Sequence, residues 1–265
     1  MVKLGIHGAG GRMGQRLVAL AGKDDDLDLV VALEHKEHPQ LGADSGLVAE
    51  GVANQLPLVC ELDGQPDVII DFSVPQACDN ILHLAAREKI PLVVATTGLT
   101  AEQQEKLKQS SQQIPIVWAP NMSLAVNLTM KLVSQAAAAL SRVASGVDVE
   151  IIDRHHRFKE DSPSGTALRF GELIASEMGQ TVHQHGRQGI LGQRPRNEIG
   201  YHALRVGDNP GEHSIVFGML GEMIELTVRS TDRDCYAMGA LEAAKFVAGK
   251  PVGIYSMFDV LNLNS

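Results

Sequence analysis

The chain has little of what disulfide-stapled, nucleic-acid-binding or membrane-spanning proteins depend on. Its 265 residues contain only three cysteines, Cys60, Cys78 and Cys235, which are too few and too scattered for a disulfide framework or a cysteine-based zinc motif. The formal net charge of −9 argues against general binding to nucleic acids or anionic membranes. No apolar run approaches the ~20 residues that span a bilayer. We therefore expect a reduced, cytoplasmic setting, with no nucleic-acid or membrane partner.

Aromatic residues are also scarce, at 4% of the chain, whereas glycine is plentiful, with 26 residues. The remaining composition, 44% hydrophobic and 21% charged, is that of an ordinary globular protein. Residues 1–6 lead straight into an apolar strand and show no signal-peptide plan. The length suits one large domain or two modest ones, so the order of strands and helices has to decide the organisation.

A glycine-rich turn, with the sequence GAGGRMG, follows the first predicted strand, Lys3–His7. A helical pattern of apolar residues comes directly after it. Strand, glycine turn and helix form the context in which such a motif binds the pyrophosphate of a dinucleotide. The third glycine, Gly14, falls one place later than in the usual G-x-G-x-x-G pattern, and an ordinary strand–helix turn is the alternative. The candidate cofactor residues here are Gly8, Ala9, Gly10, Gly11, Arg12 and Met13.

An acidic residue stands where a dinucleotide-binding turn predicts one. The second apolar strand, Asp28–Leu33, ends at Glu34, about twenty residues past the glycines, where a carboxylate holds the 2′-hydroxyl of the adenine ribose. His35 and Lys36 follow at once and can instead pair with a 2′-phosphate. Glu34 favours NADH, its basic neighbours leave NADPH open, and a solvated strand-end carboxylate is the alternative for Glu34.

Strands and helices continue to alternate through the first half of the chain. Strands are predicted at 66–71, 92–95 and 116–118, helices at 75–89 and 100–113, and loops or short turns at 36–55. This order implies a parallel, doubly wound, Rossmann-like sheet, in which ligands bind at the carboxyl ends of the strands. The candidate cofactor residues at the later strand ends are Ala95, Thr96, Thr97, Ala119, Pro120, Asn121 and Met122.

The second half of the chain predicts a different kind of sheet. A helix from Ser123 to about Leu140 precedes a strand at 147–152, and further strands are expected at 198–206, 214–217 and 223–229. The region 181–197 lacks clear periodicity and is expected to be a mobile loop. We expect a second, α+β domain with a mainly antiparallel sheet of about four strands. The predicted division is a dinucleotide-binding domain of residues 1–122, completed by 233–265, and a substrate-binding and oligomerisation domain of residues 123–232.

The chemically densest stretch is Asp153–Thr166, DRHHRFKEDSPSGT. We predict a loop between a strand end and a helix start, with Ser164 as the N-cap. Free N–H groups at such a helix terminus bind carboxylate or phosphate. Gly165 lets an anion approach the backbone. A common helix start is the alternative interpretation.

Three basic side chains in this stretch can take part in proton transfer. Lys159 adds a positive charge, and His155 and His156 can donate hydrogen bonds or protons near neutral pH. Paired histidines in loops are, however, more often solvated or structurally bonded. No metal site is expected, because no H-E-x-x-H spacing occurs and adjacent histidines cannot easily face one metal. The stretch predicts a site for a small anionic substrate.

Together these motifs resemble the dihydrodipicolinate (4-hydroxy-tetrahydrodipicolinate) reductase family. The matching segments are GAGGRMG at 8–14, TTG at 96–98, APNMS at 119–123, DRHHRFKEDSPSGTA at 153–167, IGYH at 199–202 and GEH at 211–213. The resemblance runs nearly end to end, and its histidine–lysine motif is specific to the family.

The resemblance implies an NAD(P)H-dependent oxidoreductase that reduces 4-hydroxy-tetrahydrodipicolinate with loss of water, in lysine and diaminopimelate biosynthesis. It implies acid/base duty for His155, a proton-donor role for Lys159, and contacts of His156 with a small dicarboxylate substrate. The backbone of Gly165 and Thr166, beside Ser164, would hold a substrate carboxylate. The family is typically a homotetramer built through the substrate-domain sheet.

Two alternatives stay open at this point. One is a different oxidoreductase on the same platform, such as a sugar or semialdehyde dehydrogenase, although the latter needs a cysteine nucleophile and none lies near the histidines in sequence. The other is a catalytically silent NAD(P)-binding regulator.

Overall fold

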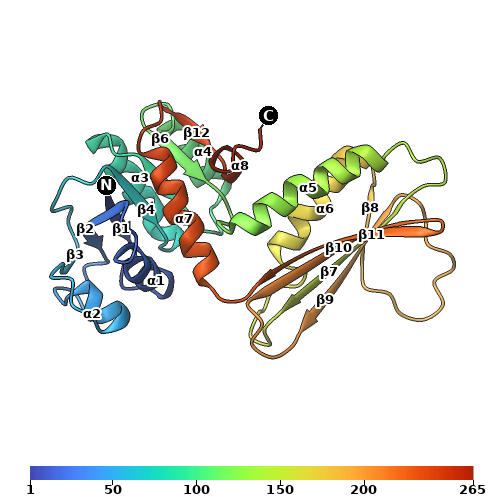
Figure 1. Cartoon of the computed structure of the whole chain (residues 1–265), viewed down its shortest axis with the longest axis horizontal. Helices are drawn as coiled ribbons and strands as arrows, with labels where there is room; N and C mark the ends of the chain where they lie inside the picture. Colours follow the sequence, from blue (N-terminus) through green and yellow to red (C-terminus); the bar gives the residue numbers. More distant parts are fainter. Residues whose placement is uncertain (265) are drawn as a thin grey trace. The chain divides into compact units, whose positions relative to one another are not determined.

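The computed structural model describes residues 1–264, so the last position of the predicted segment 233–265 lies outside the described residues. The chain divides into two compact units. The first unit is Met1–Leu124 together with the segment from Asp234 onward, and the second unit is Ala125–Arg233. Figure 1 traces the chain through both by colour. Within the described residues, no helix combines the length and the hydrophobicity needed to cross a membrane.

The first unit is built on a seven-stranded sheet whose pairings are all parallel among the described residues. Its strands are β1 (Val2–His7), β2 (Leu27–Leu33), β3 (Leu58–Val59), β4 (Val68–Asp71), β5 (Leu92–Val94), β6 (Pro115–Trp118) and β12 (Gly253–Tyr255). They lie in the order β12-β6-β5-β4-β1-β2-β3. The order reverses at β1, which makes the sheet doubly wound. The predicted Rossmann-like sheet is therefore confirmed.

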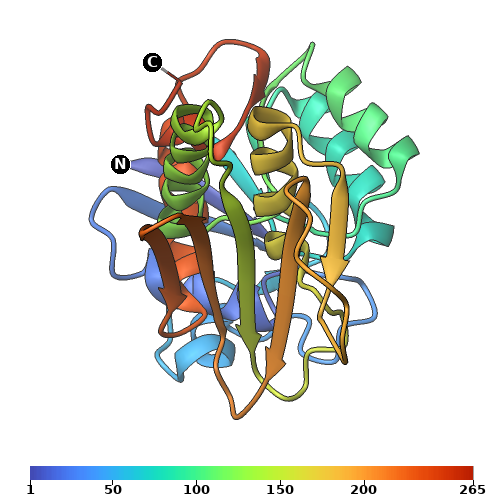
Figure 2. The same ribbon diagram turned by 90° about the vertical axis from the view of Figure 1, so that its right-hand side faces the viewer.

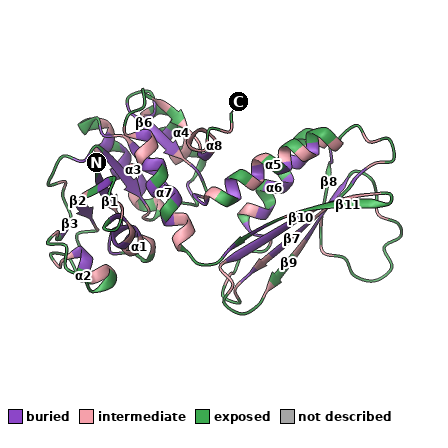
Figure 3. Cartoon of the chain, in the orientation of Figure 1, coloured by how far each residue is buried: buried purple, intermediate pink, exposed green. Residues whose placement is uncertain are grey.

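Helices cover both faces of this sheet, because its strands carry apolar side chains on each side. They are α1 (Arg12–Ala21), α2 (Ser45–Glu50), α3 (Pro75–Glu88), α4 (Ala101–Ser110), α7 (Asp234–Val247) and α8 (Met257–Val260). One core joins Leu4 of β1 to Leu17 of α1 and to the alanines of α7. The other joins Ile69 of β4 to Ile81 of α3. Each such burial contributes roughly 1.5–3 kcal/mol, and Figure 3 shows the buried residues concentrated on the strands.

The second unit holds a five-stranded sheet in the order β11-β10-β7-β9-β8. The strands are β7 (Asp148–His155), β8 (Val182–His185), β9 (Glu198–Arg205), β10 (Gly211–Met219) and β11 (Glu222–Ser230), and the helices are α5 (Leu124–Leu140) and α6 (Gly165–Met178). Strand β10 is antiparallel to both neighbours, whereas β9 is parallel to β7 and β8. The predicted second, α+β sheet is present, with five strands instead of four. Figures 1 and 2 show these strands side by side, with α5 and α6 on one side of the sheet.

The structure differs from the sequence prediction in three segments. The region 181–197 contains β8, an edge strand whose side chains are mostly exposed, so no apolar alternation marks it. The region 36–55 contains the six-residue helix α2, capped by the carboxylate of Asp44. The strand predicted at 147–152 continues to His155 as β7. The predicted loop therefore begins after His155, and Asp153 lies on a strand.

Candidate functional site

An open pocket of about 900 Å³ lies in the first unit, at the carboxyl ends of β1, β2 and β4 and along the start of α3. This is where a doubly wound sheet binds nucleotides, because the loops on the two sides of the reversal point separate there. Among the predicted cofactor residues, those lining the pocket are Gly8, Gly11, Arg12, Met13, Glu34, His35 and Thr97.

The glycine turn at the edge of this pocket is held in shape by close backbone packing. Gly8 has φ +80°, a left-handed conformation that favours glycine. A Cβ on Gly14 would collide with the backbone of Gly8 and Ala9. Gly14 therefore lets helix and strand pack closely, the part played by the third glycine of a dinucleotide-binding motif. Gly11 is the N-cap of α1 and offers no side-chain acceptor, so the first-turn N–H groups suit a phosphate.

The carboxylate of Glu34 is bonded to the turn itself. Its Oε2 accepts a hydrogen bond of 2.8 Å from the N–H of Gly10, and its Oε1 accepts one of 2.8 Å from the N–H of His35. Glu34 is half-buried, and both of its oxygens are engaged by backbone N–H groups. Glu34 fixes the end of β2 beside the glycines, at the rim where His35 and Lys36 also line the pocket.

The other predicted cofactor residues lie outside the pocket lining. Ala9 and Gly10 are buried behind the turn, and Ala95 and Thr96 are buried at the end of β5. The side chains of Ala119 and Met122 belong to the apolar core, whereas Pro120 is exposed and Asn121 is half-buried. Any contact from 95, 119 or 122 to a cofactor would have to come from the backbone.

A hydrogen-bond network beneath the pocket was not anticipated from the sequence. Asp71, the last residue of β4, is 0% exposed. Its carboxylate lies 2.7 Å from Nδ1 of His7, and it accepts bonds of 2.6 Å from the Ser73 hydroxyl and 2.8 Å from the Thr96 hydroxyl. The sequence did contain a signal for this network, because the apolar strands β1 and β4 each end in a polar residue.

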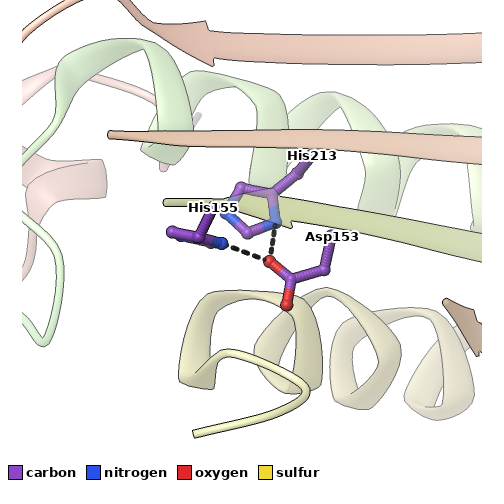
Figure 4. A group of neighbouring side chains, drawn as sticks. All are labelled: Asp153, His155 and His213. Atoms are coloured by element: carbon purple, nitrogen blue, oxygen red, sulfur yellow. Dashed lines mark ion pairs between the residues drawn. The ribbon is translucent and has the colours of Figure 1, made fainter. Parts of the chain in front are cut away.

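In the second unit, sheet register assembles a buried cluster around Asp153. Strand β7 is central, and Asp153 lies opposite His213 of β10 while His155 lies opposite Arg205 of β9. Alternation along β7 buries Asp153 and His155. Nδ1 of His155 lies 2.7 Å from Oδ1 of Asp153, and Nδ1 of His213 lies 3.6 Å from the same oxygen. Figure 4 shows both rings turned toward this carboxylate.

The other oxygen of Asp153 ties the helix start and the loop to the strand. It accepts a 2.9 Å bond from the N–H of Ser164 and a 3.1 Å bond from the guanidinium of Arg205. Arg205 also donates to the carbonyl of Asp161, at 2.6 Å. Arg205 was missed in the sequence, because only the pairing of β9 with β7 brings it near the motif.

These contacts fix the charges of the cluster. Burial alone would raise the pKa of Asp153, but the bonds from His155 and Ser164 outweigh it and hold the pKa well below its usual range. Burial lowers the pKa of His213 to about 4, although Asp153 opposes that shift. Burial, followed by the charge of Arg233, also lowers the pKa of His156. At neutral pH, Asp153 is therefore ionised, and His213 and His156 are neutral.

The start of α6 and the lysine complete the region. Ser164 is the N-cap, as predicted, and its hydroxyl accepts a 3.2 Å bond from the N–H of Ala167. Gly165 is exposed, and a Cβ there would meet nothing within 4 Å. Nζ of Lys159 lies 2.7 Å from Oδ1 of Asp161, with its side chain 22% exposed. The predicted substrate residues thus lie on one strand end, one loop and one helix start.

Asp153, His155 and His213 also offer three potential ligand atoms within 4.8 Å of one another. The sequence could not indicate this group, because it forms across two strands. Arg205 already supplies a cation to the same carboxylate, and a metal ion there would be repelled by it. Asp153 and Arg205 form an internal ion pair, and the rings of His155 and His213 are turned toward the same carboxylate.

Comparison with known proteins gives the same assignment over both units. The family models described as "Dihydrodipicolinate reductase, N-terminus" and "Dihydrodipicolinate reductase, C-terminus" match residues 2–122 and 125–261. The 4-hydroxy-tetrahydrodipicolinate reductase of Rhodopirellula baltica is 54% identical, over 99% of this chain and 97% of its own. That of Syntrophotalea carbinolica is 42% identical, over 99% and 100%.

Solved structures agree. A dipicolinate-bound dihydrodipicolinate reductase from Paenisporosarcina sp. TG-14 is similar with a TM-score of 0.78 and 25% identity, covering 98% of each chain. Aspartate semialdehyde dehydrogenase II of Vibrio cholerae shares the fold alone, with a TM-score of 0.54, 12% identity, and coverage of 93% of this chain and 98% of that one. Both alternatives left open by the sequence are thereby set aside. The chain belongs to the dihydrodipicolinate reductase family, as an NAD(P)H-dependent oxidoreductase that reduces 4-hydroxy-tetrahydrodipicolinate in the biosynthesis of lysine through diaminopimelate.

Proposed function

We propose that the reaction is divided between the two units. The pocket of the first unit holds NADH or NADPH, and the region formed by β7, the following loop and α6 in the second unit binds the dicarboxylate and handles its protons. One observation carries this proposal: an ionised, buried Asp153 holds both His155 and the N-terminus of α6. An acid–base group and an anion-binding helix start are thereby fixed to the same carboxylate.

The helix start suits one carboxylate of the substrate. The N–H groups of Gly165 and Thr166 belong to the first turn of α6, and the helix dipole favours a negative charge there. Ser164 contributes through its cap, which fixes the turn, because its hydroxyl is engaged by Ala167. His156, held neutral by burial, is suited to a hydrogen bond with the substrate. The dipicolinate bound to the Paenisporosarcina reductase is a small dicarboxylate of the kind this site would take.

Proton transfer is assigned to His155 and Lys159. With Nδ1 of His155 beside Asp153, Nε2 is the nitrogen left to exchange protons as water is lost from the ring. A nicotinamide dinucleotide, when bound, would supply the hydride. Adding it to the conjugated imine leaves an enamine carbon that needs a proton. Lys159, an ammonium donor paired with the exposed Asp161, can deliver that proton.

The cofactor residues are assigned from the pocket. The glycine turn and Arg12 hold the pyrophosphate, and Glu34 bonds the adenine ribose once its contact with Gly10 is exchanged for a hydroxyl. The exposed His35 and Lys36 offer charge to a 2′-phosphate, so we propose that both NADH and NADPH are accepted.

Assembly and location complete the proposal. Met223 and Ile224 of β11 and Leu204 of β9 are exposed apolar side chains on the second sheet, at 69%, 42% and 39%. Exposed apolar residues on a sheet favour association, which supports a homotetramer built through this unit. We propose a cytoplasmic location from the family's biosynthetic role.

The test follows the loss of nicotinamide absorbance, with NADH and NADPH in parallel and the substrate made in place from pyruvate and aspartate semialdehyde by the preceding synthase. Rapid oxidation is expected with both cofactors. Lys159→Ala should lower kcat by about 10²- to 10⁴-fold, with the circular dichroism spectrum retained. The exposed Lys108→Ala should leave kcat unchanged. Near-normal turnover of Lys159→Ala would remove Lys159 from the mechanism.

A further inference from the structure

His7 is a titratable side chain that neither the glycine motif nor the proposed mechanism uses. It ends β1, directly before the turn at Gly8, and its side chain lines the cofactor pocket. The side chain is 17% exposed, so it is enclosed by protein on most sides and open to the pocket on the rest. Strand-end residues of a doubly wound sheet face its ligand, and His7 therefore stands where a bound cofactor passes.

The ring of His7 is held by the buried carboxylate of Asp71. Register pairs the two residues across β1 and β4, and Nδ1 of His7 lies 2.7 Å from Oδ1 of Asp71. Two hydroxyls, from Ser73 and Thr96, also donate hydrogen bonds to that carboxylate. A fully buried carboxylate is stable only when it is hydrogen-bonded and paired with a cation or a polarised donor. Among the described residues, His7 is the ionisable group that pairs with Asp71.

This pairing decides which nitrogen a ligand meets. A histidine that donates Nδ1–H to a carboxylate has its orientation and tautomer fixed and keeps Nε2 for another partner. Within the described residues, no hydrogen bond joins Nε2 of His7 to the protein. The neighbouring pocket wall is the start of α1, with Gly8, Gly11 and Arg12. That wall suits a phosphate, because it joins the N-terminus of α1 to the positive side chain of Arg12.

We propose that His7 is a cofactor-binding residue: Asp71 orients the imidazole through Nδ1–H, and Nε2 takes up a proton with the anionic ligand and donates a hydrogen bond to the pyrophosphate of the dinucleotide. The inference rests on the proposed function in taking this pocket as the cofactor site. His7 would thus be a third group that attracts the pyrophosphate, together with the N-terminus of α1 and Arg12, and it does so from the end of β1.

Two substitutions separate the two ring nitrogens. The amide nitrogen of His7→Asn can replace Nδ1 and keep the bond to Asp71, but it offers nothing at the position of Nε2. The amide of His7→Gln reaches the position of Nε2 and gives up the bond to Asp71. His83→Asn, at an exposed histidine of α3, is the matched control.

Calorimetric titration of each variant with NADH and with ADP-ribose tests the proposal, since ADP-ribose keeps the pyrophosphate and lacks the nicotinamide. For His7→Asn we expect the Kd of both to rise about tenfold, consistent with one charge-assisted bond, at an unchanged melting temperature. His7→Gln should recover part of the affinity, and His83→Asn should bind as the wild type does. Unchanged Kd values in His7→Asn would overturn the inference, as would a loss confined to NADH.

A second measurement uses the wild-type chain in case His7→Asn fails to fold. Protein labelled with ¹⁵N-histidine is titrated with ADP-ribose, and NMR follows the two ring-nitrogen resonances of His7. These resonances are assigned by their loss in His7→Gln. A shift at Nε2 larger than at Nδ1 supports the bond, and no shift at Nε2 rejects it. If the wild type binds neither NADH nor ADP-ribose, the proposed function fails. If it binds both and His7 is silent, only this inference fails.

Discussion

The helices α1 and α6 each have a glycine in their first turn, and the two glycines lie in opposite surroundings. Gly14 of α1 is packed so tightly that a Cβ would strike the backbone of Gly8, whereas Gly165 of α6 faces open space. The N-cap of α1 is a glycine without a side chain, and that of α6 is a serine that caps its own helix. Glycine serves close packing in the first unit, and in the second it leaves open space where we propose that the substrate binds.

The surroundings of the two termini differ in the same way. Around α1 the proposed anion site is made chiefly from backbone, with exposed cations at the rim. Around α6 the proposed site is made from side chains clustered on Asp153. That carboxylate accepts hydrogen bonds from Ser164 at the helix start and from Arg205 of β9, and it lies 2.7 Å from Nδ1 of His155. A site made from backbone groups suits the pyrophosphate of a dinucleotide, a ligand that many proteins bind. A reaction that moves protons instead needs ionisable side chains at fixed positions.

The largest expected effect compares the two glycines directly. Gly14→Ala should destabilise the chain by about 3 kcal/mol or more, because the added Cβ has no room beside backbone atoms. Gly165→Ala should change the free energy of unfolding by less than about 1 kcal/mol and raise KM for the substrate. Urea unfolding and steady-state kinetics measure the two. A normal KM in Gly165→Ala would take the start of α6 out of substrate binding.

An intermediate effect is expected for Asp153→Asn, which keeps the size of the side chain and removes its charge. We expect kcat to fall about 100-fold, because His155 loses the carboxylate that orients Nδ1. The Kd for NADH, a property of the first unit, should not change. Asp148→Asn, at an exposed acid on the same strand, is the control. An equal loss of kcat in both variants, or a matching loss of NADH binding, would mean that Asp153 acts only through the stability of the fold.

The smallest effect is expected for Glu34, which lines the proposed cofactor pocket. Glu34→Ala should weaken NADH binding several-fold, on the order of 1 kcal/mol for one hydrogen bond, and NADPH binding less, since Glu34 pairs with a ribose hydroxyl that NADPH lacks. Binding titrations with both cofactors measure this. Glu34→Gln is the control for the structure of the turn, because its amide oxygen keeps an acceptor for the N–H of Gly10. Equal losses with the two cofactors would place Glu34 outside the ribose site.

The sequence predicts features that depend on neighbouring residues, and it does not predict those that depend on residues far apart in the chain. The parallel sheet and the cap at Ser164 depend on local patterns, and both are found in the structure. Edge strand β8 carries too few apolar residues for its pattern to predict it. The contacts of Arg205 and His213 with Asp153 depend on register between strands that are more than fifty residues apart in the sequence. No local pattern contains that register, and the pairing of His7 with Asp71 was missed for the same reason.

The last strand of the parallel sheet has a consequence for how the chain is made. Strand β12 pairs with β6, yet the whole of the second unit lies between them in the sequence. During synthesis the second unit is contiguous and can fold as soon as it leaves the ribosome. The nucleotide-binding sheet has to wait, with the edge at β6 unpaired, until α7 and β12 have emerged. An unpaired strand edge is prone to pairing with other chains, so we expect the edge at β6 to be open to such pairing until β12 has been made.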